Sequence, residues 1–282
     1  MSRLCLPLLF ALSSLVYAEK PPARNDQVIV VAKNSTAADI PVKTTEIRSI
    51  ISRVNKALEK YPDDSKARVL LRSIYSNHPD HDGMQAYPHA IVPLDEEGRP
   101  HGIERFYGVG AGHGWMFREL PWEHGIMEGE EKAYERNVLK TIIPWRADKV
   151  EGVRKTLYRN GRTLIAATYK NGLANGPTYS YDNKGNVTRE ANLKDGKRHG
   201  NVREFWPGTK QIKREIQYDM GRVVGVMKEF YSTGAIKKEL PFKDNMMHGV
   251  EVQYEADGTV RRKKYWLEGD TVSAKVFGAH WK

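Results

Sequence analysis

The C-terminal half of the chain repeats one pattern of apolar and polar positions. Each repeat begins at a glycine, and these glycines stand at 152, 176, 200, 225 and 249. Five residues further on stands an apolar or aromatic residue in every repeat: Leu157, Tyr181, Phe205, Phe230 and Tyr254. A turn follows, and after it comes a second stretch in which apolar and polar residues alternate. Alternation with a period of two predicts strands, so each unit is predicted to be a β-hairpin.

The second predicted strand of each unit carries two further columns. Its second position holds Thr163, Val187, Ile212, Ile236 and Val260, and its eighth holds Tyr169, Leu193, Tyr218, Phe242 and Trp266. Because positions of equal parity lie on one face of a strand, we expect both columns to line the same face. Residues that tolerate a positive φ then turn the chain into the next unit. The hairpins should therefore follow one another as a long antiparallel meander, with two less regular units expected at Gly102 and Gly129.

Several segments of this array carry a family resemblance: "GNVREFW", "GVMKEFYSTGAIKKE" and "YDNKGNVTREANLKDGKRHG". They resemble the MORN-repeat variant found in many bacterial proteins, over roughly residues 100 to 270 and most clearly from 152. The resemblance implies an elongated, open, twisted sheet with no catalytic machinery. It also implies protein contacts, scaffolding or binding of acidic phospholipid. Some relatives are labelled antitoxin-like, but the secretion signal described below argues against a cytosolic toxin-neutralising role.

The region between residues 19 and 95 has a different pattern. Residues 28–32, VIVVA, predict a short strand, and apolar residues recur with a helical period from Ile47 to Tyr61. Pro62 should end that helix. A second helix is expected directly after it, with one apolar face: Ala67, Leu70, Leu71, Ile74 and Tyr75. We therefore predict a mainly β protein, an open antiparallel meander over residues 96–282 preceded by a small α-helical hairpin similar to one TPR-type unit. The hairpin is expected to cover an end of the sheet.

Residues 1–18, MSRLCLPLLFALSSLVYA, have the features of a signal peptide. Arg3 supplies the positive charge, an apolar run follows, and Val16-Tyr17-Ala18 fits a cleavage site. The alternative is an uncleaved membrane anchor, but the apolar run is shorter than the ~20 residues that span a bilayer. Cleavage would remove Cys5, the one cysteine, and with it any disulfide, thiol nucleophile or thiolate metal ligand. We expect a periplasmic or extracellular protein.

Positive charge is concentrated in the repeats. The chain has a net charge of +10, whereas residues 152–282 alone hold 25 Lys and Arg against 14 Asp and Glu. Such a surface favours acidic partners, and secretion makes nucleic acid an unexpected one. The fourth position of the second strands forms a basic column: Arg189, Arg214, Lys238 and Arg262. It is either a docking strip for an acidic partner or a solvated surface with cross-strand ion pairs, each worth about 0.2–1 kcal/mol. The glutamates that follow, at 190, 215 and 239, should point to the opposite face.

Candidate chemistry outside the array is sparse. The stretch NHPDHDGMQAYPH brings together His78, Asp80, His81, Asp82 and His89. Imidazole and carboxylate groups at this density could bind a divalent metal, but Pro79 and Gly83 favour a polar linker. His-Gly pairs begin at 101, 113, 124, 199 and 248, where they indicate turn chemistry. The run GVGAGHG, 108–114, lacks the strand-loop-helix context of a phosphate-binding loop. No cofactor is expected.

These observations favour a secreted, non-enzymatic repeat protein that serves as a protein-protein interaction scaffold in the cell envelope. Three alternatives stay open. In the first, the basic column and neighbouring aromatic residues bind acidic phospholipid or an anionic polymer. In the second, the protein is a metal-dependent enzyme that uses the segment from His78 to His89. In the third, the array has a purely structural role and only spaces or stabilises a larger envelope assembly.

Overall fold

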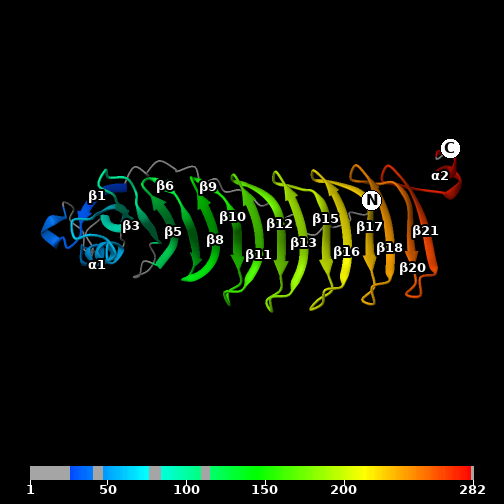
Figure 1. Cartoon of the computed structure of the whole chain (residues 1–282), viewed down its shortest axis with the longest axis horizontal. Helices are drawn as coiled ribbons and strands as arrows, with labels where there is room; N and C mark the ends of the chain where they lie inside the picture. The colour runs from blue at the N-terminus through cyan, green and yellow to red at the C-terminus, as the bar shows by residue number, and fades with distance from the viewer. Residues whose placement is uncertain (1–25, 41–46, 76–83, 109–114, 281–282) are drawn as a thin grey trace.

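The computed structural model describes residues 26–40, 47–75, 84–108 and 115–280. Within these residues, a single antiparallel sheet of 22 strands runs the length of the protein. Figure 1 shows an elongated molecule in which the strands stand side by side, with α1 at one end and α2 at the other. The predicted fold class, a mainly β, open antiparallel meander of hairpins, is confirmed.

The helices are α1 (Ile47–Ala57) and α2 (Ala274–His280), with a short 3-10 helix η1 at Ala37–Asp39. The strands of the N-terminal region and the first two hairpins are β1 (Asp26–Ala32), β2 (Lys66–Tyr75), β3 (Met84–Leu94), β4 (Gly102–Gly108), β5 (Trp115–Glu123), β6 (Ile126–Met127), β7 (Gly129–Glu135), β8 (Val138–Arg146) and β9 (Lys149–Val150). The remaining strands are β10 (Gly152–Leu157), β11 (Thr163–Lys170), β12 (Leu173–Tyr181), β13 (Val187–Lys194), β14 (Lys197–Arg198), β15 (Gly200–Phe205), β16 (Ile212–Asp219), β17 (Arg222–Phe230), β18 (Ile236–Lys243), β19 (Met246–Met247), β20 (Gly249–Tyr254), β21 (Val260–Leu267) and β22 (Asp270–Val272).

The predicted hairpin units are confirmed. Strands β10–β11, β12–β13, β15–β16, β17–β18 and β20–β21 form the five regular units, and β4–β5 and β7–β8 form the two earlier ones. The glycine that begins a unit pairs with the eighth position of the second strand, as Gly152 does with Tyr169 and Gly249 with Trp266. Each unit then pairs with the next through its second strand, so the hairpins form a single continuous ladder.

The two columns of the second strand lie on opposite faces, so the expectation that they share a face is wrong. Each of the five regular hairpins has a register shift near its turn. In the first, Thr156 pairs with Ile165 but Leu157 pairs with Thr163, which leaves one extra residue on the second strand. A bulge of this kind interrupts the alternation of faces. The second position of the second strand therefore pairs with the apolar or aromatic residue that ends the first strand, and both lie on one face of the sheet. The fourth, sixth and eighth positions of the second strand lie on the opposite face.

The glycine at the start of a unit is required by its backbone and by its surroundings. Gly249 has a φ of 122°, and a Cβ added there would lie 2.7 Å from Cγ of Pro241 in the preceding unit. Gly200 occupies the same place in its unit with a φ of 84°, but nothing lies within 4 Å of its added Cβ. A positive φ is costly for other residues. Some units therefore require glycine for its φ alone, and others also for the close approach of a neighbour.

The N-terminal region is part of the same sheet. The predicted strand at 28–32 is confirmed in β1, and the first predicted helix is confirmed as α1, which ends at Ala57 rather than at Tyr61. The second helix is wrong, because residues 66–75 form β2 between β1 and β3. In β2 the buried residues Ala67, Val69 and Leu71 alternate with exposed or half-exposed ones, which is the period of a strand.

The best-buried core lies in this N-terminal region. Ile50, Val54 and Leu58, in and just after α1, are fully buried against residues of β1–β3: Ile29, Val31, Ala67, Val69, Leu71 and Ile91. The helix thus covers one face of these strands rather than the outer edge of β1, which pairs with β2 alone among the described residues. At the other end, α2 places Phe277 against Tyr265 of β21. Neither described helix is long and apolar enough to cross a membrane.

We predict that Gly249→Ala destabilises the protein clearly more than Gly200→Ala. Both variants bear the cost of a positive φ, about 1–2 kcal/mol, but only the first forces a Cβ onto Pro241. Urea unfolding of the two variants measures the difference. Equal losses of stability would show that the approach between units does not constrain this glycine.

Candidate binding surface

The basic column is part of a charged row that crosses the sheet. Within it, directly paired residues on one face run from Arg189 through Glu204, Arg214, Glu229, Lys238 and Gln253 to Arg262. We call this face the row face. Acidic or amide side chains therefore stand between the four predicted basic residues. The column predicted from sequence exists, but in the structure opposite charges alternate along it from Arg189 to Lys238, and the neutral Gln253 separates Lys238 from Arg262.

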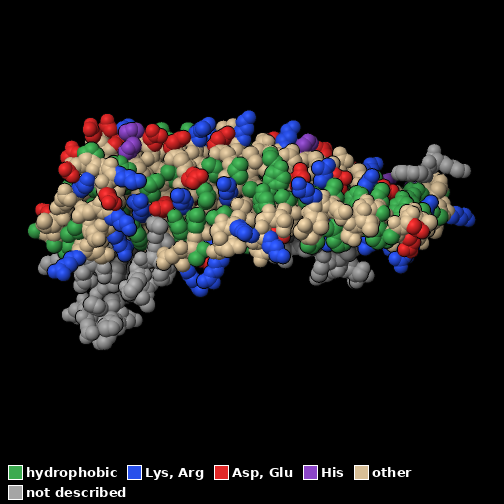
Figure 2. Space-filling model, turned by 60° about the horizontal axis from the view of Figure 1, so that its bottom comes forward, with side chains coloured by type: hydrophobic (Ala, Val, Ile, Leu, Met, Phe, Trp, Pro, Cys, Tyr) green, Lys and Arg blue, Asp and Glu red, His purple; other side chains and the backbone are tan. Residues whose placement is uncertain are grey.

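Two of the four basic residues are held by carboxylates. Arg214 donates to Oε2 of Glu204 from both Nε, at 3.1 Å, and a terminal nitrogen, at 2.7 Å. Lys238 lies 3.4 Å from Oε1 of Glu251. Arg262 is exposed, and among the described residues neither it nor Arg189 forms an ion pair. On the face of the molecule that Figure 2 shows, Lys and Arg side chains are spread among acidic and hydrophobic ones rather than gathered in one patch.

The opposite face, which we call the reverse face, carries its own ion pairs. Arg203 donates to Glu215 at 2.8 Å, and Lys228 lies 3.6 Å from Glu239. The Tyr134 hydroxyl donates to Glu119 at 2.9 Å. Burial, this hydrogen bond and the charge of Glu119 together raise the pKa of Tyr134 to about 12. Glutamates that follow the basic position of the second strand, such as Glu119, Glu215 and Glu239, therefore stabilise the reverse face through contacts within and between units.

Three glutamates at the third position of their units are buried on the row face: Glu104, Glu131 and Glu251. Each accepts a hydrogen bond at 2.9 Å from the indole nitrogen of a tryptophan at the eighth position of the second strand: Trp122, Trp145 and Trp266, respectively. Glu131 also accepts from Arg118, which takes in its unit the place that Arg189 takes three units later. Sequence reasoning missed these bonds, although glutamate at the third position and tryptophan at the eighth occur together in these three units.

Electrostatics of these carboxylates follow from their partners. Burial alone would raise the pKa of Glu251, but bonds from Gln253, Lys238 and Trp266 hold it below its ordinary value. Glu251 is therefore charged at neutral pH and neutralises Lys238. A buried carboxylate that accepts this many hydrogen bonds stabilises the row face and is not a candidate catalytic acid or base.

The aromatic rows have a mainly structural role. The first-strand row (Tyr181, Phe205, Phe230 and Tyr254) and the eighth-position row (Tyr169, Tyr218, Phe242 and Trp266) are all half-buried between neighbouring strands. Rings at the turns of the hairpins are more available. The ammonium groups of two exposed lysines lie over half-buried rings, Lys213 over Trp206 at 5.2 Å and Lys237 over Tyr231 at 5.6 Å. Such lysines place positive charge beside apolar surface at this edge of the sheet.

Two shallow grooves lie beside these rings, and we call them the turn-edge grooves. One, of about 170 Å³, is lined by Glu204, Trp206, Lys213, Arg214, Glu229, Phe230 and Lys237. The other, of about 220 Å³, is lined by Glu229, Tyr231, Lys237, Lys238, Gln253, Tyr254 and Arg261. The charged row contributes to both grooves. Successive units therefore present one surface that combines basic side chains, aromatic rings and the row.

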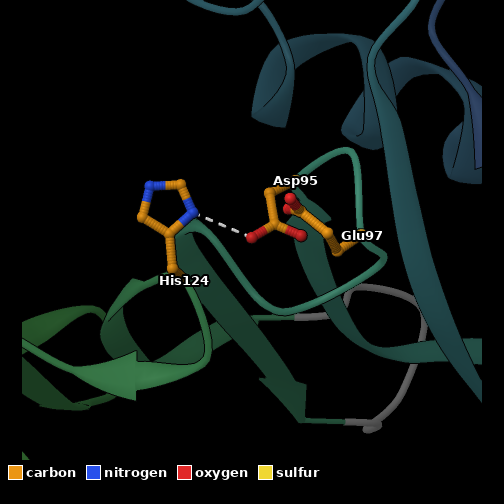
Figure 3. A group of neighbouring side chains, drawn as sticks. All are labelled: Asp95, Glu97 and His124. Carbon is orange, nitrogen blue, oxygen red and sulfur yellow. Dashed lines mark hydrogen bonds and ion pairs between the residues drawn. The ribbon is translucent and has the colours of Figure 1, made fainter.

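A third cluster joins the N-terminal region to the array. Asp95 and Glu97 lie in the loop after β3, and His124 lies in the turn after β5, as Figure 3 shows. Nδ1 of His124 donates to Oδ2 of Asp95 at 2.8 Å, and Arg99 binds both carboxylates, also at 2.8 Å. These three side chains could hold a metal ion, but both carboxylates are already engaged by the Arg99 guanidinium. The arrangement is that of a clasp between loops.

The remaining sequence candidates have structural contacts or lie outside the described residues. His101 stacks on His124 with ring centroids 4.4 Å apart, and Nδ1 of His248 accepts from the backbone of Glu268 at 3.4 Å. These contacts confirm turn chemistry at those His-Gly pairs. His89 contacts Phe106, Phe117 and the carbonyl of Tyr107. The signal segment 1–18, His113, and the metal candidates His78, His81 and Asp82 lie outside the described residues.

We predict that Trp145→Phe costs about 1–3 kcal/mol, because Oε2 of buried Glu131 then lacks its donor. Trp206→Phe is the matched control, since the Trp206 indole nitrogen has no hydrogen-bond partner among the residues that the structure describes. Urea unfolding compares the two variants. If Trp206→Phe is as costly as Trp145→Phe, the hydrogen bond is not the cause.

We also predict that the clasp is sensitive to acid. Burial would raise the pKa of Asp95, but hydrogen bonds from His124 and Arg99 and the Arg99 charge hold it well below its ordinary value of 3.8. The unfolded state then binds the proton more tightly, so the contribution is complete above that value and is lost as the pH falls below it. Thermal unfolding between about pH 6 and pH 3 should show a weaker pH dependence for Asp95→Asn than for wild type. Glu97→Gln, which alters a more exposed carboxyl, should change the profile less; an unchanged profile for Asp95→Asn would contradict this role.

Comparison with known proteins gives one family match. Residues 223–244 match the model of the MORN repeat variant. No curated protein matches the chain. The matched segment covers most of β17, the turn after it and β18, one hairpin of an array in which the same register recurs in neighbouring units. MORN repeats are generally modules that bind proteins or membranes and are generally non-enzymatic, and the match supports a MORN-repeat protein.

Proposed function

We propose that the protein is a secreted, non-enzymatic scaffold that binds another protein of the cell envelope. The observation that carries the proposal is the shape and chemistry of the array. A single-layer sheet repeats the same groove between successive units, and the grooves are shallow and lined by basic and aromatic side chains. A surface of this kind suits an extended partner better than a small substrate, which needs an enclosing pocket.

Residue chemistry along the turn-edge grooves indicates the character of the partner. Trp206 and Tyr231 supply apolar area, and Lys213 and Lys237 supply exposed positive charge beside them. Aromatic residues are enriched where protein interfaces are energetically important, and basic groups favour an acidic counterpart. We infer that an acidic segment of the partner lies along these grooves. The secreted setting rests on the signal-like segment 1–18.

Binding to acidic lipid or to an anionic polymer is the second candidate. It is favoured by the exposure of Arg262 at one end of the charged row and by the net charge of the chain. It is weakened by the ion pairs within the row, since Arg214 and Lys238 are already bound by Glu204 and Glu251. A membrane surface attracts free basic groups, about 1 kcal/mol for each near the surface.

We predict that residues 19–282 retain a protein partner from envelope extract at moderate salt. Lys213→Glu with Lys237→Glu should abolish retention, because like charges would then face the partner's acidic groups. The control is Lys170→Glu with Lys194→Glu, which makes the same change in charge at exposed positions of the opposite turn edge. Quantitative pull-down measures the three proteins. Retention of acidic vesicles alone would favour the lipid candidate, and equal loss in both double variants would remove the grooves from the account.

A further inference from the structure

Arg189 differs from the other basic residues inside the charged row. An apolar residue stands where its carboxylate partner is expected, and no other carboxylate of the described residues binds it. Arg118 and Lys238 stand at the same place in their units, and each is bound by a glutamate of the next unit, Glu131 or Glu251. In the pairing register these glutamates stand two residues before the residue directly opposite the base. Arg189 pairs directly with Glu204, so the equivalent position is Val202.

The neighbouring carboxylate does not compensate for this difference. Glu204 stands between Arg189 and Arg214 in the row, and its Oε2 accepts both hydrogen bonds from Arg214. Nε of Arg189 is buried and has no hydrogen-bond partner among the described residues. On its other side, Arg189 is paired with Ser180, which carries no charge. A half-buried guanidinium with no carboxylate is costly.

Further basic groups surround this position. Arg198 lies over the ring of Tyr218 at 5.3 Å and donates to its hydroxyl at 3.3 Å. Burial lowers the pKa of Arg189, and the charges of Arg198 and Arg214 lower it further, against the opposing effect of Glu204. Arg198 and Arg214 thus add positive charge around Arg189, and Glu204, the carboxylate whose charge opposes them, is already bound by Arg214. Such an excess of positive charge favours an added anion.

We propose that Arg189, with Arg198 and Arg214 beside it, binds a carboxylate of an acidic segment of the partner protein. The ligand takes the role that Glu131 and Glu251 play for Arg118 and Lys238 elsewhere in the array. The array's own partners for this position are carboxylates, which is why we assign a carboxylate rather than a phosphate. Arginine binds a carboxylate through two parallel hydrogen bonds in one plane. The interaction is stronger where the pair is half-buried.

This inference rests on the proposed scaffold function and locates its specificity. The site lies next to the first turn-edge groove, because Arg214 and Glu204 belong to both the row and the lining of that groove. A partner that places an acidic side chain at Arg189 can therefore continue past Lys213 and Trp206. The charged row then contributes one specific site rather than a uniform basic strip.

The test uses a fluorescently labelled hexaglutamate peptide and measures its anisotropy with the full mature chain. Arg189→Gln should weaken binding by about tenfold or more, because a charge-assisted pair is lost. Val202→Glu should do the same while Arg189 remains, because it restores the internal carboxylate seen at Glu251. Arg262→Gln, at the exposed far end of the row, is the matched control and should change binding less than about twofold.

The test requires that each variant is folded, so that a loss of binding is not a loss of structure. Arg189→Gln removes an unpaired charge, so it is expected to fold, and urea unfolding checks this for each variant. If Val202→Glu does not fold, Arg189→Gln decides alone. Hexaglutamate binding within about twofold of wild type in folded Arg189→Gln would overturn the proposal. So would inorganic phosphate or phosphatidylglycerol vesicles that bind through Arg189 when hexaglutamate does not.

Failure of this inference is distinct from failure of the scaffold function. If wild type retains an envelope protein and folded Arg189→Gln retains it equally, the scaffold stands and the Arg189 site falls. If hexaglutamate binding depends on Arg189 but no envelope protein is retained, the site stands and the scaffold function falls.

Discussion

Every unit of this protein depends on its neighbours for cover, because the array is a sheet with a single layer. Among the described residues, helices pack only at its two ends, so the small and apolar residues of the row face are covered by side chains of adjacent strands. This cover leaves four residues of the row face almost inaccessible to solvent: Ala167, Ala191, Val202 and Leu240. The dependence explains the nearly constant length of the five regular units, since a strand of different length would shift these residues out of register with the next unit. The third unit confirms the rule, because its longer turn, residues 206–211, absorbs the one extra residue.

The same dependence explains where charge is found. A residue of the row face has a neighbour on each adjacent strand, so like charges side by side would be costly and opposite charges are favourable. The sequence of pairs from Arg189 to Lys238 follows this logic, and buried Glu251 extends it into the next unit. The positive charge of the array is thereby largely used within the sheet. What remains for a partner is local: the lysines over rings at the turn edge, Arg262 at the exposed end of the row, and Arg189, where Val202 takes the place of a carboxylate.

Much of this architecture can be predicted from the sequence, since a fixed spacing of glycines and aromatic residues defines both the hairpins and their order. The bulge could not be predicted, because counting positions assumes that the alternation of faces is unbroken. Residues 66–75 were ambiguous for a different reason: Ala67, Leu70, Leu71 and Ile74 fit a helix, while Ala67, Val69 and Leu71 fit a strand. Pairing with β1 and β3 decides the outcome. Basic residues were also visible in the sequence, but which carboxylate each one binds depends on the register between strands. Asp95 and His124 meet only because two separate turns lie side by side.

The central claim is that, from Arg189 to Lys238, the charge of the row is compensated within the sheet except at a local site around Arg189. Hydrogen exchange with and without a saturating hexaglutamate peptide, read by mass spectrometry, tests it most directly. The account predicts that added protection is confined to the strands that carry the site and the adjoining groove, β13 to β18. Protection spread evenly along the array as far as Arg262 would show a uniform basic surface and would contradict it.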